Sequence, residues 1–148
     1  MKQSARGSIG AAHAAAAAAL CAAIAVSAGT PAAGRQSSGM RSTQTGVYTA
    51  AQAARGETTF ANICMGCHTT AAYAAPAFVK KWSGRPLGEL YALIAETMPE
   101  DFPGTLSPGE YAQVVAYLLK LNRMPAGDEE LPADQAALDK IRFETGDR

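Results

Sequence analysis

Apolar residues recur at helical spacing most clearly in residues 107–122. Ser107 and Glu110 have the spacing of a capping box, and Pro108 stands at the first helical position. Apolar residues then follow three and four positions apart as far as Leu119. The pattern predicts a helix that begins after Ser107 and ends near Asn122.

Two further helices are predicted upstream. The first runs from about Thr49, which serves as its N-cap, to Ile63. The second covers roughly residues 87–97, and Pro99 stops it. A shorter helical pattern covers residues 134–141.

No segment shows the alternation of a β-strand, so the predicted class is all-α. Residues 76–86 and 99–109 are rich in proline and glycine and are expected to be two long connections. Long loops in a small domain are often functional, so both are expected to wrap a ligand held by the three main helices.

The first 28 residues have the pattern of an export signal. Lys2 and Arg6 precede an apolar stretch, residues 14–26, and Ala28 closes a cleavage site of small residues. A retained anchor is the alternative. The stretch is mostly alanine and is short against the roughly 20 apolar residues of a spanning helix, which favours cleavage. We therefore expect a periplasmic protein without a stable membrane span.

The pattern divides the remaining chain into three parts. Residues 29–46 lack periodicity and are predicted to be a flexible leader. Residues 47–126 carry the helical pattern, and residues 127–148 form an acidic C-terminal extension. A domain of about 80 residues supplies little core of its own, so the chain is expected to lose much of its fixed tertiary structure without a buried cofactor.

Charge argues against binding to nucleic acid. The chain has 13 basic and 13 acidic residues, and loss of Lys2 and Arg6 with the signal leaves 11 basic residues, a formal charge near −2. The same cleavage removes His13 and Cys21, which leaves one histidine and two cysteines.

Those three residues form one motif, Cys64-Met65-Gly66-Cys67-His68. Two cysteines separated by two residues and followed by histidine are the attachment signature of haem c. Each thiol can bond to one vinyl group of the porphyrin, and the adjacent imidazole becomes the proximal ligand of the iron. The motif predicts one covalent haem.

Two other readings of the cysteine pair compete with haem. A thioredoxin-type redox disulfide follows a strand and lies at a helix N-terminus, whereas the residues before Cys64 are rich in alanine and read as helix. Structural zinc takes four ligands, and Cys64, Cys67 and His68 supply three.

With no second histidine after cleavage, the sixth position of the iron is left to methionine, another weaker ligand, water or nothing. Met40 lies in the leader, Met65 lies inside the attachment turn and Met124 follows the last helix. Met98 stands 30 residues after His68, at a helix end. A methionine is more often core filler, but elimination and position favour Met98 as the ligand opposite His68.

Residues 50–124 resemble a class I cytochrome c, in particular the small periplasmic cytochromes associated with quinoproteins. The resemblance rests on Gly56 and Phe60 before the attachment motif, then on Ala75-Pro76, Met98-Pro99 and the helix through Tyr117. It implies an all-α fold of three main helices wrapped around one covalent haem. It also implies that Gly56 and Phe60 cross the final helix beside Tyr117.

The resemblance extends to residues around the haem. It implies that the Pro76 carbonyl accepts the Nδ1 proton of His68. It also implies that Trp82 and Arg85 contact haem propionates, with core packing and a solvated surface charge as the alternative readings.

The expected function is one-electron transport without catalysis of its own. The expected partners are redox proteins, with a quinoprotein dehydrogenase as donor and a terminal oxidase as acceptor. Lys80, Lys81 and Arg85 form a candidate basic patch near the haem edge, or a solvated surface. The alternatives are a ligand-binding or peroxidatic haem protein with a displaceable sixth ligand, and a cytochrome subunit of a larger dehydrogenase complex.

Overall fold

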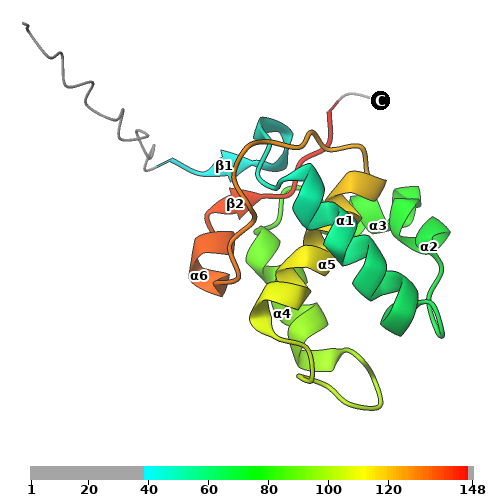
Figure 1. Ribbon diagram of the computed structural model, residues 1–148. Helices are drawn as coiled ribbons and strands as arrows, with labels where there is room; N and C mark the ends of the chain where they lie inside the picture. The colour runs from blue at the N-terminus through cyan, green and yellow to red at the C-terminus, as the bar shows by residue number, and fades with distance from the viewer. Residues whose placement is uncertain (1–38, 147–148) are drawn as a thin grey trace, which may run out of the picture. The chain divides into compact units, whose positions relative to one another are not determined.

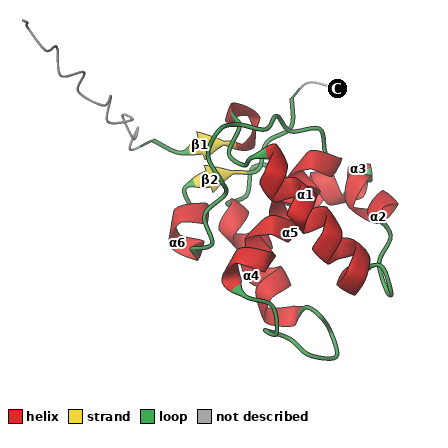
Figure 2. Cartoon of the chain, viewed as in Figure 1, coloured by secondary structure: helices red, strands yellow, loops and turns green. Residues whose placement is uncertain are grey.

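The computed structural model describes residues 39–146 (Figure 1). The predicted export signal, residues 1–28, and the first part of the predicted leader lie outside the described residues. The described part is mostly helical with two short strands, which fits the predicted all-α class (Figure 2). Its α-helices and strands are β1 (Arg41–Ser42), α1 (Ala50–Thr59), α2 (Thr70–Ala74), α3 (Pro76–Trp82), α4 (Leu87–Thr97), α5 (Pro108–Leu121), α6 (Gln135–Leu138) and β2 (Ile141–Arg142).

The predictions for α4 and α5 are confirmed. α4 spans residues 87–97, and α5 carries the capping box that the sequence predicts. The Ser107 Oγ accepts a hydrogen bond from the Glu110 N–H at 3.3 Å, and the Glu110 carboxylate accepts one from the Ser107 N–H at 2.8 Å. These bonds satisfy backbone donors that the first helical turn leaves free.

The first predicted helix changes geometry before its end. Thr49 caps α1 as expected, by accepting a hydrogen bond from the Gln52 N–H at 3.0 Å. After Thr59 the chain widens into a π-helical segment, η2 (Phe60–Cys64). Such segments are rare and often occur at functional sites. η2 delivers Cys64 to the end of the helix.

α1 packs most extensively against α5, and Gly56 lies where the two helices cross. A Cβ atom at Gly56 would lie 1.8 Å from the Gln113 carbonyl oxygen, so only glycine allows this approach. The Phe60 ring lies 5.5 Å from the Tyr117 ring, centroid to centroid. The crossing implied by the sequence resemblance is therefore present.

We expect Gly56→Ala to lower the free energy of unfolding by about 3 kcal/mol, because the added methyl group forces α1 away from α5. Gly109→Ala is the matched control, since a Cβ atom there meets nothing within 4 Å. Alanine is the better helix former, so the control should gain up to about 1 kcal/mol. Chemical denaturation measures both, and similar stabilities for the two variants would contradict the packing argument.

The connection expected over residues 76–86 is largely helical. Pro76 is the first residue of α3, which continues to Trp82, and α2 lies just before it. Proline suits the first turn of a helix because the missing N–H has no partner there. The proline and glycine content of residues 76–86 predicts a loop and gives no sign of α2 or α3.

The predicted leader and the predicted C-terminal extension contact each other in the structure, so the described chain does not divide at residues 46 and 126 as predicted. β1, within the predicted leader, pairs in parallel with β2, within the predicted extension. Thr43 is fully buried, and its hydroxyl donates to the Glu144 carbonyl oxygen at 2.6 Å while accepting from the Glu144 N–H at 2.8 Å. Residues 39–46 and the end of the described chain therefore form a clasp.

The clasp also closes part of the core. Gln52 is buried on α1, and its side-chain amide makes two hydrogen bonds with the Leu131 backbone, at 2.7 and 2.8 Å. The apolar residues of the acidic segment are buried as well: Leu131, Leu138, Ile141 and Phe143. The domain therefore continues well past residue 126, because these side chains lie in the core.

Candidate functional site

The backbone after η2 turns tightly and holds the attachment motif together. The Cys67 and His68 N–H groups both donate to the Cys64 carbonyl oxygen, at 3.2 and 2.9 Å. The Met65 N–H donates back to Phe60 at 3.0 Å. The turn places both thiols and the imidazole on one side, where Cys64, Cys67 and His68 line the same pocket.

The pocket is open, largely apolar and about 810 Å³ in volume, including the part that is open to solvent. Its apolar walls come from η2, α2, α4, α5 and the loop before α5. The wall residues are Phe60, Ile63, Tyr73, Ile94, Leu106, Val114 and Leu118.

Met98 lines the same pocket from the end of α4. The other three methionines of the described residues, Met40, Met65 and Met124, do not line it. Met40 and Met65 are exposed, and Met124 is buried in the larger core cluster. The structure therefore brings together Cys64, Cys67, His68 and Met98, the four residues that the sequence analysis singled out for the iron and its porphyrin.

Tyr111 fixes the backbone of Met98. Its side chain is 3% exposed, and its hydroxyl donates a hydrogen bond to the Met98 carbonyl oxygen at 2.7 Å. The Met98 N–H donates to the Ile94 carbonyl oxygen at 2.9 Å. Both polar backbone groups of Met98 are therefore held. The helical spacing of Tyr111 in the sequence gives no sign of this contact.

Residues 51–118 match the family model described as cytochrome c oxidase, cbb3-type, subunit III. The match supports a class I c-type cytochrome. It covers the attachment motif, the pocket walls and Met98, and it supports haem c binding and electron transport. No significant match to a curated protein or to a solved structure was found.

The residues that line the pocket fit a porphyrin by their own chemistry. Both cysteines are free thiols at its edge, and the remaining lining is mostly apolar, as a large aromatic macrocycle requires. Zinc fits poorly, because no group of three or more His, Cys, Asp or Glu side chains within residues 39–146 could hold a metal ion.

A redox dithiol fits poorly as well. Burial raises the pKa of the Cys64 thiol, whereas reactive redox cysteines have a lowered pKa. Cys64 also lies at the C-terminal end of η2, where the helix dipole disfavours a thiolate. Both features favour a cysteine that stays a neutral thiol until it is modified.

The His68 ring packs against Tyr73, with centroids 5.6 Å apart. The Tyr73 ring lies at 90° to the Phe60 ring, with centroids 5.5 Å apart. The Tyr73 carbonyl oxygen accepts a hydrogen bond from the Asn122 side-chain amide at 2.9 Å. No hydrogen bond joins His68 to the Pro76 carbonyl in the described residues. Tyr73, missed in the sequence analysis, is the aromatic neighbour that the structure gives to this imidazole.

Trp82 and Arg85 do not line the pocket. Trp82 is 3% exposed in the core, and the Arg85 guanidinium lies 4.5 Å from the centre of its ring. Arg85 also forms an ion pair with Glu89 one helical turn on. Trp82 thus packs in the core and Arg85 carries a paired charge, and the contact of either residue with a haem propionate stays a prediction.

We expect Tyr111→Phe to lower the free energy of unfolding of the holoprotein by about 1–2 kcal/mol, because the Met98 carbonyl loses its buried partner. Tyr91→Phe is the matched control. The Tyr91 hydroxyl makes only long contacts of 3.4 Å, to the Pro108 and Ala133 carbonyls. Thermal unfolding compares the two, and equal losses would argue against a specific role for Tyr111 beside Met98.

Proposed function

We propose that the chain is a periplasmic monohaem cytochrome that carries single electrons and has no catalytic activity of its own. Cys64 and Cys67 would hold one haem c through thioether bonds, and His68 and Met98 would ligate its iron. The observation that carries the proposal is the pocket, which is lined by all four residues and by largely apolar walls.

The bound haem would supply an Fe(II)/Fe(III) couple. The protein would set its reduction potential and keep water away from it. His68 and Met98 would fill both axial positions, so that no substrate reaches the metal. A methionine ligand raises the reduction potential relative to a second histidine. The apolar walls exclude water, and the Tyr111 contact holds the Met98 backbone in place.

Periplasmic location rests on the export signal predicted for residues 1–28. None of the helices within residues 39–146 is long and apolar enough to span a bilayer. The proposed donor is a dehydrogenase such as a quinoprotein, and the proposed acceptor is a terminal oxidase.

The test is expression of the full chain in a bacterium that attaches haem to periplasmic cytochromes. Mass spectrometry of the denatured periplasmic protein is expected to show a chain cut near residue 28 that carries the mass of one haem. Cys64→Ser/Cys67→Ser should lack that mass. A full-length chain, or haem that leaves on denaturation of the unmutated protein, would contradict the proposal.

A second candidate is a cytochrome subunit of a larger complex, which the description of the matched family as an oxidase subunit favours. In such a subunit, Cys64, Cys67, His68 and Met98 would hold the haem in the same way, and only the partner protein would differ. Purification under mild conditions from the native membrane and periplasm distinguishes the two, since a subunit should elute with its complex and a free carrier alone.

A further inference from the structure

Exposed apolar side chains gather at the mouth of the pocket. Within residues 39–146, five large hydrophobic residues are exposed: Met40, Ile63, Met65, Leu93 and Phe102. Ile63 lines the pocket, Met65 lies between its two cysteines, and Phe102 follows the lining residue Asp101. Exposed apolar groups that cluster in this way mark an interaction site more often than scattered ones do.

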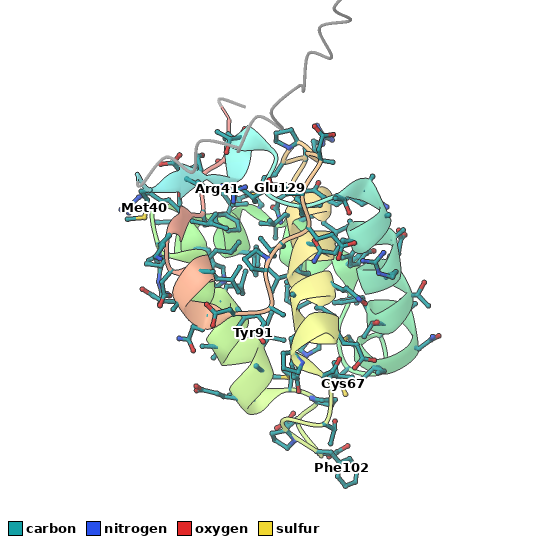
Figure 3. All side chains as sticks on the ribbon, turned by 60° about the vertical axis from the view of Figure 1, so that its left-hand side comes forward. Met40, Arg41, Cys67, Tyr91, Phe102 and Glu129 are labelled. Atoms are coloured by element: carbon teal, nitrogen blue, oxygen red, sulfur yellow. The ribbon has the colours of Figure 1, made fainter. Side chains whose placement is uncertain are left out.

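Phe102 is the most prominent of these residues. Its side chain is 70% exposed, and Figure 3 shows it at the end of a loop, pointing away from the body of the domain. Cys67 is labelled at the same end in this view, whereas Glu129 and Met40 lie at the opposite end. The clasp is therefore remote from the pocket mouth.

The charges at the mouth are negative. Glu100 and Asp101 line the pocket, both are exposed, and neither forms an ion pair with another described residue. Among the residues that the structure describes, no lysine or arginine lines it. The candidate basic patch of Lys80, Lys81 and Arg85 belongs to α3 and the turn after it, where Lys81 and Arg85 lie over the Trp82 ring.

We infer that Ile63, Met65, Glu100, Asp101 and Phe102 form a docking surface, here called the mouth surface. Its occupant is a redox protein whose own redox centre is ringed by lysine and arginine. The inference rests on the proposed function and adds the partner's chemistry. The apolar residues exclude water where the two centres approach, and the two carboxylates steer a basic partner to them.

The mouth surface carries negative charge, whereas the candidate patch named from the sequence, Lys80, Lys81 and Arg85, is basic. A second copy of this chain is a poor occupant, because it would place Glu100 and Asp101 against like charges. Small apolar contacts ringed by complementary charge suit a weak, transient encounter, as rapid electron exchange requires.

The test measures electron transfer by stopped-flow absorbance from the reduced holoprotein to two ferric or cupric probes. One electron leaves the holoprotein and enters the probe in each turnover. The basic probe is a mitochondrial cytochrome c, and the acidic probe is an acidic blue-copper protein. With the basic probe, the rate constant should fall at least about tenfold between low and high salt. With the acidic probe, it should rise with salt.

Variants locate the effect on the mouth surface. Glu100→Gln/Asp101→Asn should lower the low-salt rate constant with the basic probe about fivefold and flatten its salt dependence. Asp128→Asn/Glu129→Gln is the matched control, because it removes the same charge beside the clasp. Phe102→Ser should lower the rate constant at every salt concentration without changing the salt slope.

Equal effects of the two charge-removing variants would overturn the inference, as would a rate constant with the basic probe that is independent of salt. A stable dimer abolished by Phe102→Ser would also overturn it. These results are distinct from failure of the proposed function, in which the unmutated protein would carry no covalent haem or would not undergo reversible one-electron reduction.

Discussion

Met98→Ala is expected to abolish the weak near-infrared band that arises when methionine sulfur ligates ferric haem. The substitution removes the only described methionine that lines the pocket and leaves the His68 side of the pocket unchanged. We also expect a lower reduction potential, because the weakly donating thioether is replaced by water or a hydroxide. Absorption spectroscopy of the oxidised variant and redox titration measure the two effects.

The control variants are Met40→Ala and Met65→Ala, which alter exposed methionines outside the pocket. Both should keep the band. Met124→Ala should keep it as well while losing stability, because Met124 is 3% exposed within the core. Survival of the band in Met98→Ala, or its loss in Met65→Ala, would assign the ligand elsewhere.

Removal of both thiols is expected to unfold the pocket side of the domain. In Cys64→Ser/Cys67→Ser the apolar walls have no covalent haem between them, and the smaller core cluster faces water. That cluster contains Phe60, Val114, Tyr117 and Leu118. We expect a loss of about 3 kcal/mol or more, which corresponds to a melting temperature at least about 12 °C lower.

Because the clasp lies away from the pocket, the thiol-free variant should lose structure in only part of the domain. The larger core cluster includes Leu131, Leu138 and Ile141 and lies outside the pocket lining. Hydrogen exchange should therefore become fast in residues 60–75 and 98–107 while the clasp stays protected. Met65→Ser, which keeps both thiols, is the control. A thiol-free variant that melts with the holoprotein would refute the idea that the haem completes the core.

Local signals account for the parts of the fold that the sequence predicts well. The capping box at Ser107 and the proline after α4 act within one turn of chain, so the helix bounds follow from residues next to them. The attachment motif is equally local, because Cys64, Cys67 and His68 belong to one turn. Met98 needed an argument by elimination, and the structure places it in the pocket.

The missed features depend on contacts that leave no pattern of their own in the sequence. β1 and β2 are only two residues long and pair across almost the whole domain, so neither has a strand pattern of its own. Tyr111 and Tyr73 acquire their roles from Met98 and His68, which the sequence does not place beside them. The contact between Trp82 and Arg85 is of the same kind, and their predicted role beside haem propionates stays a prediction.

The central claim is that protein ligands fill both axial positions of one covalent haem. The most direct measurement is the absorption spectrum of the reduced protein before and after addition of carbon monoxide. If His68 and Met98 hold both positions, the spectrum stays unchanged in the native protein, and Met98→Ala binds the gas. Rapid, tight binding to the unmutated protein would contradict the account and favour a ligand-binding haem protein.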